Sequence, residues 1–189
     1  MRRSPAVGHD RRMATLFLIV GLPGAGKTTR AKELAAAHPA LRLTPDEWMI
    51  PLFGEPEADG KRDVVEGRFI SVALRALRLD TSVALDFGFW RRDERSALRE
   101  LARSVGPASQ VVYLPVDRGE QFRRIERRQA ATPEQTFPLT IAELDLWREE
   151  FEAPDAAELT DDGHIPGPPA GWPDWARWAA WRWPSLTTD

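Results

Sequence analysis

Residues 21–28 read Gly-Leu-Pro-Gly-Ala-Gly-Lys-Thr and follow the pattern G-x-x-x-x-G-K-[S/T] of a phosphate-binding P-loop. Glycines let the backbone turn tightly and bring its N–H groups close to phosphate oxygens. The pattern assigns Lys27 to the β- and γ-phosphates of a nucleotide and the Thr28 hydroxyl to Mg²⁺. The nucleotide-binding residues predicted from this motif are Gly21, Leu22, Pro23, Gly24, Ala25, Gly26, Lys27, Thr28 and Thr29.

The residues on either side of the loop support this interpretation. Residues 15–20 form a short apolar, β-rich run, and residues 27–38 have the composition of a helix. A helix that begins at the loop directs its positive dipole end at the bound phosphates. The chain has only three lysines against twenty-three arginines, and one of the three lysines stands where the loop requires it.

The composition is that of a globular enzyme domain. Of the 189 residues, 42% are hydrophobic and 29% are charged, which is enough apolar material for a sizeable core. The net charge of −3 gives no general attraction to nucleic acid or anionic membranes, and no apolar run is long enough to span a membrane. No cysteine is present, so disulfides and thiolate metal sites are excluded. We expect a cytoplasmic enzyme.

Strand-like and helix-like segments alternate along the chain. Further strands are predicted at residues 40–44, 82–86 and 111–116, and helices at 61–79, 96–105, 118–131 and 140–151. This alternation predicts an α/β fold with three layers, in which helices cover both faces of a mainly parallel sheet of about five strands. Pro115 lacks an N–H donor, which favours an edge position for the last strand.

Two aspartates stand where predicted strands end, and open α/β sheets bind their ligands at that edge. Asp46 fits a general base that takes the proton of an acceptor hydroxyl, and it equally fits a helix N-cap. Asp86 ends an apolar strand as a Walker B carboxylate does, so it is a candidate ligand for Mg²⁺; its alternative role is a turn residue. Arg68, on the following helix, is assigned to solvent, with substrate contact as the alternative.

Arginines gather in two later segments. Arg124, Arg127 and Arg128 stand at i, i+3 and i+4 and therefore share one helix face. They form either a helical lid that closes over a triphosphate or a solvated basic helix.

The other basic segment follows the strand that ends at Asp86. Arg91, Arg92 and Arg95 are expected to pair with the neighbouring Asp93 and Glu94 rather than with a substrate phosphate.

Four motifs, taken in order along the chain, resemble one family. They are residues 21–29, residues 44–48, residues 85–90 followed by Arg92, Glu94 and Arg95, and residues 124–129. This family comprises small P-loop kinases often labelled AAA-family ATP-binding proteins, similar to polynucleotide 5′-hydroxyl kinase, zeta toxin and chloramphenicol phosphotransferase. The resemblance covers about residues 14–158 and implies an adenylate-kinase-like sheet with a helical lid. It also implies that Asp46 is the base, that Asp86 lies near substrate and metal, and that Arg124 and Arg128 are lid arginines. Gln129 departs from the asparagine found in many relatives.

Composition and this resemblance together divide the chain into a disordered leader at 1–13, a P-loop kinase domain at 14–160, a Pro/Gly linker at 161–171 and a tail at 172–189, and the tail matches nothing in the family. The tail holds five of the eight tryptophans. Because that much exposed aromatic surface is costly, we expect the tail to form a short helix that docks on its own domain or on a second copy. A homodimer through the tail is therefore one prediction.

The predicted function is ATP- and Mg²⁺-dependent transfer of the γ-phosphoryl group to a hydroxyl of a small-molecule acceptor, with Lys27, Asp46, Arg124 and Arg128 as the catalytic residues. One alternative is a nucleic-acid 5′-hydroxyl kinase, which the net charge of −3 disfavours. Another alternative is a nucleotide-binding regulatory ATPase without an acceptor. A measurement of phosphate release distinguishes this ATPase from the two kinases. The ATPase hydrolyses ATP without an acceptor, whereas a kinase stays slow until its acceptor is added.

Overall fold

The computed structural model describes residues 14–55, 59–131, 139–160 and 163–188. The leader predicted at 1–13 and nearly all of the segment between the helices predicted at 118–131 and 140–151 lie outside these residues. The described chain is an α/β fold built on a parallel sheet, as the alternation of strands and helices predicts.

The sheet has four strands in the described residues, one fewer than the number predicted. They are β1 (Thr15–Val20), β2 (Leu41–Leu43), β3 (Val83–Gly88) and β4 (Ala108–Tyr113), in the order β2-β3-β1-β4 with every pair parallel. β4 lies at an edge, as Pro115 suggests, but it covers residues 108–113 instead of 111–116. The apolar run mispredicts this strand because an edge strand tolerates polar residues such as Ser109 and Gln110.

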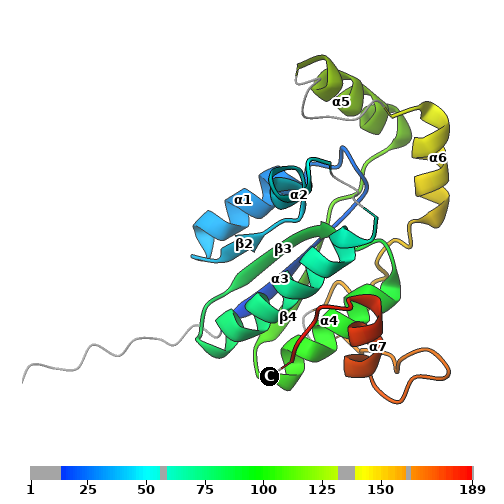
Figure 1. Cartoon of the computed structure of the whole chain (residues 1–189). Helices are drawn as coiled ribbons and strands as arrows, with labels where there is room; N and C mark the ends of the chain where they lie inside the picture. The colour runs from blue at the N-terminus through cyan, green and yellow to red at the C-terminus, as the bar shows by residue number, and fades with distance from the viewer. Residues whose placement is uncertain (1–13, 56–58, 132–138, 161–162, 189) are drawn as a thin grey trace, which may run out of the picture.

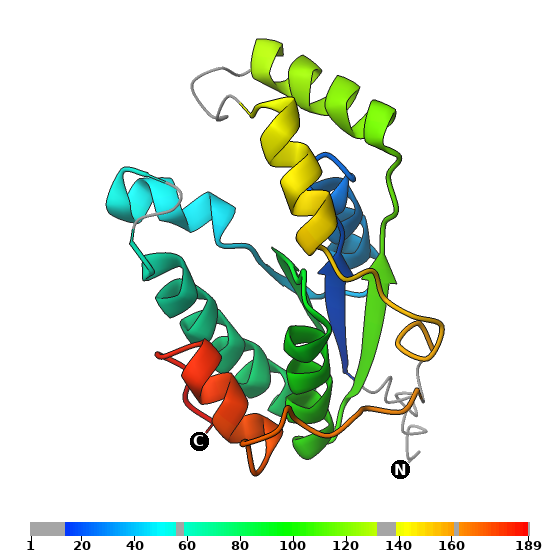
Figure 2. The same cartoon turned by 90° about the vertical axis from the view of Figure 1, so that its right-hand side faces the viewer.

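Helices cover both faces of the sheet (Figure 2). Phe17 and Ile19 of β1 pack on one face against α1 (Lys27–Ala37), in a small apolar cluster. Leu16, Leu18 and Val20 point to the other face, because side chains alternate along a strand. The larger core on that face is shared with α3 (Lys61–Arg78) and α4 (Arg92–Ser104).

Three helices lie beyond the carboxyl ends of the strands: α2 (Asp46–Phe53), α5 (Arg118–Ala131) and α6 (Ile141–Glu150). Figure 1 shows α5 and α6 standing above the sheet on the side of the P-loop. This places the predicted lid arginines and the two candidate aspartates at the same edge of the sheet.

The predicted arginine pairs in α4 form, but with other partners. Arg92 contacts Asp155 at 2.8 Å, and Arg95 contacts Glu158 at 2.7 Å. The prediction that they pair with Asp93 and Glu94 is wrong, because residues one or two positions apart on a helix do not face each other. These ion pairs tie the irregular segment after α6 to α4.

The C-terminal tail forms the expected helix, α7 (Trp175–Arg182), and it docks on its own chain beside α3 and α4 (Figures 1 and 2). Trp175, Trp178 and Trp183 are buried in the main core, whereas Trp181 stays exposed. Docking within the chain is thus confirmed, and a homodimer through the tail stays a prediction. Among the described residues, no helix has the length and apolar character needed to cross a membrane.

Candidate active site

The P-loop connects β1 to α1 and passes close to β4 and α5. A side-chain Cβ on Gly21 would come within 2.8 Å of the Leu114 carbonyl oxygen. Gly24 has φ +80°, and a Cβ there would come within 3.2 Å of both the Gln121 carbonyl oxygen and Ile125. Glycine at these two positions therefore allows the loop to turn beneath α5 while keeping its backbone amides free of side-chain bulk.

Lys27, the first residue of α1, lies at the centre of the site. Its Nζ donates to the Leu22 carbonyl oxygen at 3.1 Å. Burial lowers the pKa of the Lys27 amine, and the nearby carboxylates of Asp86 and Asp46 act in the opposite direction. Arg62 and Arg128 also lower its pKa. Four charged side chains from four other elements thus surround the P-loop lysine.

Asp86, at the end of β3, is buried and faces the start of α1. Burial raises the pKa of its carboxyl, while Lys27 and a hydrogen bond from Thr28 act to lower it. Its Oδ2 atom lies 3.6 Å from the Arg42 guanidinium and accepts no hydrogen bond from the residues that the structure describes. A buried carboxylate oxygen beside a threonine hydroxyl is a donor set that suits Mg²⁺, which takes few protein ligands and completes its shell with water and phosphate.

No larger acidic cluster offers another metal site in the described part of the chain, where no three His, Cys, Asp or Glu residues come together to hold an ion. Thr28 and Asp86 have the chemistry to ligate Mg²⁺ carried by a nucleotide. The sequence motifs predict both Thr28 and Asp86 as metal ligands.

Asp46 is the first residue of α2, and Pro45 holds the N-cap position. The alternative role of Asp46 as an N-cap is therefore not what the structure shows. Its side chain is 65% exposed at the carboxyl edge of the sheet, and Oδ1 accepts a hydrogen bond from Arg62 Nη2 at 2.9 Å. No hydrogen bond from the described residues reaches Oδ2. An exposed carboxylate with one oxygen fixed and one available is suited to orienting an acceptor hydroxyl.

Sequence reasoning missed Arg62. It weighed Arg68, which instead donates to Thr187 near the C-terminus. One signal was present in the sequence, because Arg62 and Glu66 stand at i and i+4 on a predicted helix and form an ion pair of 3.2 Å. Nothing in the sequence connects that pair to Asp46.

The segment after Asp86 turns sharply beside the lysine. Gly88 and Phe89 both have positive φ, +100° and +41°, and the Phe89 carbonyl oxygen accepts from Arg95 Nη1 at 3.2 Å. A Cβ on Gly88 would lie 3.7 Å from Lys27 Cε. Backbone conformations of this kind concentrate at functional sites.

Helix α5 contacts the P-loop directly. Arg124 Nη1 donates to the carbonyl oxygens of Gly24 and Ala25 at 3.3 and 3.4 Å. Gln121 Nε2 donates to the Pro23 carbonyl oxygen at 3.0 Å. Arg124 thus lies on the loop that would hold phosphate, and Arg128 acts on Lys27 electrostatically. The structure brings both predicted lid arginines to the site.

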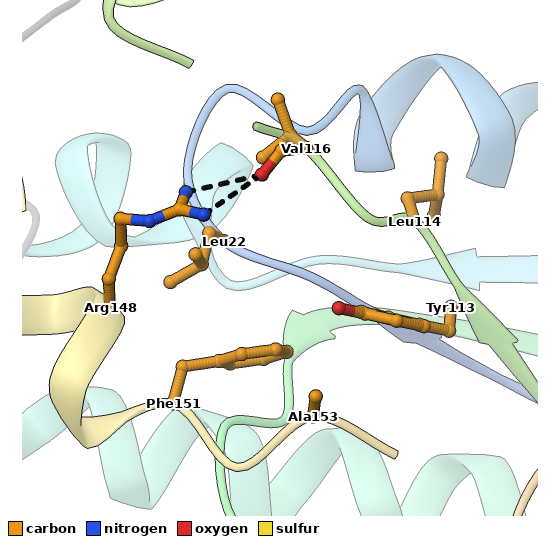
Figure 3. A pocket seen from close by; sticks show the side chains of 7 residues that line it. All are labelled: Leu22, Tyr113, Leu114, Val116, Arg148, Phe151 and Ala153. Atoms are coloured by element: carbon orange, nitrogen blue, oxygen red, sulfur yellow. Dashed lines mark hydrogen bonds between the residues drawn. The ribbon is translucent and has the colours of Figure 1, made fainter. Parts of the chain in front are cut away.

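A cavity of about 210 Å³ lies between the end of β4 and α6, beside the P-loop (Figure 3). Arg148, from α6, reaches the Val116 carbonyl oxygen with two nitrogens at 3.2 Å each and Gln121 Oε1 at 2.7 Å. The remaining lining residues are Leu22, Tyr113, Leu114, Phe151 and Ala153. Because Arg148 is committed to these acceptors, it serves to join α6 to α5 and, through Gln121, to the P-loop.

The parallel sheet, the strand–loop–helix at Lys27 and the helices above the carboxyl edge define the class: this is a P-loop kinase fold. The chain belongs to the family described as an AAA domain, which matches residues 16–154. No curated protein matches the chain.

Several solved structures share the fold. A protein from Chloroflexus aurantiacus j-10-fl, named "putative kinase", has a TM-score of 0.59 at 19% identity, covering 93% of this chain and 100% of that chain. Kti12 from Chaetomium thermophilum, in complex with ADP-AlF3, has a TM-score of 0.55 at 17% identity, covering 91% and 99%. A chain of the Pnkp1/Rnl/Hen1 RNA repair complex has a TM-score of 0.54 at 15% identity, covering 79% of this chain and 50% of that chain.

Proposed function

We propose that this chain transfers the γ-phosphoryl group of ATP, with Mg²⁺, to a hydroxyl of a small-molecule acceptor. The observation that carries the proposal is the surroundings of Lys27, where Asp86 of β3, Asp46 of α2, Arg62 of α3 and Arg128 of α5 all act on one amine. Phosphoryl transfer requires a phosphate cradle, a metal site, positive charge at the γ-phosphate and a group that orients the nucleophile. These side chains are suited to each of those roles.

The nucleotide is held by the P-loop and by Lys27. Backbone amides of the loop and the N-terminus of α1 donate to the phosphates. Lys27 exchanges its hydrogen bond to the Leu22 carbonyl oxygen for the β- and γ-phosphates. Thr28 and Asp86 would hold Mg²⁺, which would neutralise charge on the phosphate oxygens.

The acceptor is oriented by Asp46. Its carboxylate accepts the proton of the acceptor hydroxyl, and the acceptor oxygen forms a bond to the γ-phosphorus. The bond from that phosphorus to the β–γ bridging oxygen breaks, and ADP leaves with the electron pair. Arg124 and Arg128 of α5 form the lid, adding positive charge at the transferred group and excluding water.

An exposed tryptophan on α2, the helix that begins at Asp46, favours a small molecule with a hydrophobic face as the acceptor. Trp48 is 50% exposed, and its ring meets Phe69 edge-on at 5.4 Å between centroids. Exposed tryptophan at a binding site supplies contact area at low entropic cost.

A transfer screen with γ-labelled ATP tests the function. The acceptors are metabolites, antibiotics and 5′-hydroxyl oligonucleotides, and the enzymes are the wild type and Asp46→Asn. We expect label on a small hydroxyl compound with the wild type and its loss with Asp46→Asn. Label on oligonucleotides only would favour a nucleic-acid kinase. Rapid ATP hydrolysis with no labelled acceptor would favour a regulatory ATPase.

A further inference from the structure

A continuous chain of contacts joins Asp46 to the C-terminus. Arg62 Nη2 donates to Asp46 Oδ1 at 2.9 Å, and Arg62 Nε lies 3.2 Å from Glu66 Oε1. The other carboxylate oxygen of Glu66, Oε2, accepts from the indole Nε1 of Trp183 at 3.0 Å. We call Asp46, Arg62, Glu66 and Trp183 the Asp46 network.

Each member of the network is more buried than the one before it. Asp46 is exposed, the Arg62 side chain is 22% exposed, Glu66 is 6% exposed, and Trp183 is fully buried. A buried carboxylate is expensive unless its oxygens are paired, and here Oε2 accepts the Trp183 hydrogen bond and Oε1 forms the ion pair with Arg62. The buried end of the network is therefore fixed, and it limits the freedom of Arg62.

The tail supplies the fixed end. Arg182, next to Trp183, donates to Asp63 Oδ1 at 2.6 Å and to Glu94 Oε1 at 2.9 Å. These contacts tie α7 to both α3 and α4. The position of the Trp183 indole is thus set by packing and ion pairs, and not by the active site.

We propose that Arg62 and Glu66 are positioning residues for Asp46, and that the C-terminal tail completes the site by fixing Glu66 through Trp183. This inference rests on the proposed function, because it takes Asp46 as the group that orients the acceptor. Arg62 holds Oδ1 so that Oδ2 faces the acceptor hydroxyl, and Glu66 holds Arg62 in the orientation that does so. The tail therefore acts on phosphoryl transfer from outside the nucleotide site.

The charge on Glu66 gives the network a pH dependence. The groups that face Glu66 are Arg62 from α3, Arg182 and Trp183 from the tail, and Glu94 from α4. Burial raises the pKa of the Glu66 carboxyl to about 7, although Arg62, Trp183 and Arg182 lower it. Below that pH Glu66 is neutral and no longer balances the charge of Arg62, so kcat should fall as the pH decreases through 7.

The test compares Glu66→Gln with Asp80→Asn. Both changes replace a carboxylate by its amide, but Asp80 is exposed in the turn between α3 and β3, at the amino edge of the sheet and outside the Asp46 network. We expect Glu66→Gln to lower kcat about tenfold without raising KM for ATP, and to remove the step near pH 7 from the kcat profile. Asp80→Asn should keep the wild-type kcat and the step near pH 7. If Glu66→Gln lowers only the melting temperature and keeps the wild-type kcat and pH profile, the residue is structural and the proposal is overturned.

Trp183→Phe gives a second test that keeps most of the packing and removes the indole donor. It should lower kcat in the same direction as Glu66→Gln. A wild-type kcat in folded Trp183→Phe protein would exclude the tail from the network.

A third measurement is independent of any acceptor. The ¹³C carboxyl resonance of Asp46 is followed from pH 5 to 9 in the full chain. We expect it to shift near pH 7 in the wild type and in Asp80→Asn, and not in Glu66→Gln. The same titration in all three proteins would overturn the network. A network that titrates as expected in a chain that phosphorylates no acceptor would instead refute only the proposed function.

Discussion

Arg95 and Glu158 form a fully buried ion pair between residues 63 positions apart in the chain. Two guanidinium nitrogens of Arg95, Nε and Nη2, donate to the two carboxylate oxygens at 2.7 and 2.9 Å. A third nitrogen of Arg95 donates to the Phe89 carbonyl oxygen. One arginine therefore holds both the segment after α6 and the sharp turn that follows Asp86.

Breaking this pair from one side should destabilise the fold strongly. Glu158→Ala leaves a buried guanidinium without its counter-charge, so the free energy of unfolding should fall by about 3–5 kcal/mol in urea titrations. The double variant Arg95→Met with Glu158→Leu should recover most of that loss, because replacing both charges removes the uncompensated one. Equal destabilisation in the single and the double variant would show that the charge pair is not the cause.

Glu66 should make the stability of the protein depend on pH. Its pKa is about 7 in the folded chain against an ordinary value of 4.5, so the folded state binds a proton between these values that the unfolded state does not. The resulting stabilisation is complete below pH 4.5 and is lost as the pH rises through 7. It amounts to about 3 kcal/mol. Urea titrations at pH 5 and 8 should show most of this difference in the wild type, and a much smaller one in Glu66→Gln.

The sequence predicts the parts of the fold that depend on local pattern. The P-loop, its flanking strand and helix, and the alternation that requires a parallel sheet are all read from residues close together in the chain. Two element boundaries are predicted wrongly, and both lie where the hydrophobic pattern of the sequence is weak. The β4 edge strand begins in polar residues, and α4 begins at Arg92 rather than at 96 because the Glu94 side chain accepts from the Arg91 N–H at 3.3 Å.

What the sequence does not predict is contact between distant segments. The sequence predicts a neighbouring partner for Arg95. Its partner is instead Glu158, which follows α5 and α6 along the chain. Nothing in the local pattern singles out Glu66, which is buried and accepts a hydrogen bond from the Trp183 indole of the tail. Periodicity identifies the face on which a side chain lies, and it cannot identify which distant segment packs on that face.

Lys27→Ala should separate nucleotide binding from folding. The hydrogen bond that the amine makes to the described residues is to a carbonyl oxygen of the loop, so the melting temperature should remain close to that of the wild type. ATP affinity or turnover should fall by about tenfold or more, because the charge that faces the phosphates is lost. Lys32→Ala is the matched control, since Lys32 is an exposed lysine on the same helix. Calorimetric ATP titration checks both, and wild-type affinity and turnover in Lys27→Ala would contradict the P-loop assignment.

Arg128→Ala should lower kcat more than it weakens ATP binding. A lid arginine interacts most strongly in the closed transition-state complex, so its loss affects the chemical step first. We expect a reduction of about 10²-fold in kcat with little change in Kd for ATP. Arg123→Ala on the same helix serves as the control, because Arg123 pairs with Glu120. If kcat is equal in the two variants, Arg128 is only a surface charge.

Asp46→Asn is the most direct test of the proposed chemistry. Asparagine keeps the shape of the side chain and can still accept the hydrogen bond from Arg62, but it cannot take a proton. It also loses the negative charge that faces Lys27. The side chain is exposed and does not cap α2, so the substitution removes no core contact and no helix cap. Folding and catalysis should therefore respond differently.

For Asp46→Asn, the melting temperature and the Kd for ATP should stay close to the wild-type values, and transfer to the acceptor should fall by roughly 10²–10⁴-fold. Asp80→Asn carries the same chemical change on an exposed side chain at the amino edge of the sheet, and should transfer at the wild-type rate. Single-turnover assays at saturating ATP and Mg²⁺ distinguish loss of the chemical step from loss of binding. Near-normal transfer by Asp46→Asn would remove Asp46 as the base while leaving the P-loop assignment intact, because Lys27 and Thr28 do not depend on it.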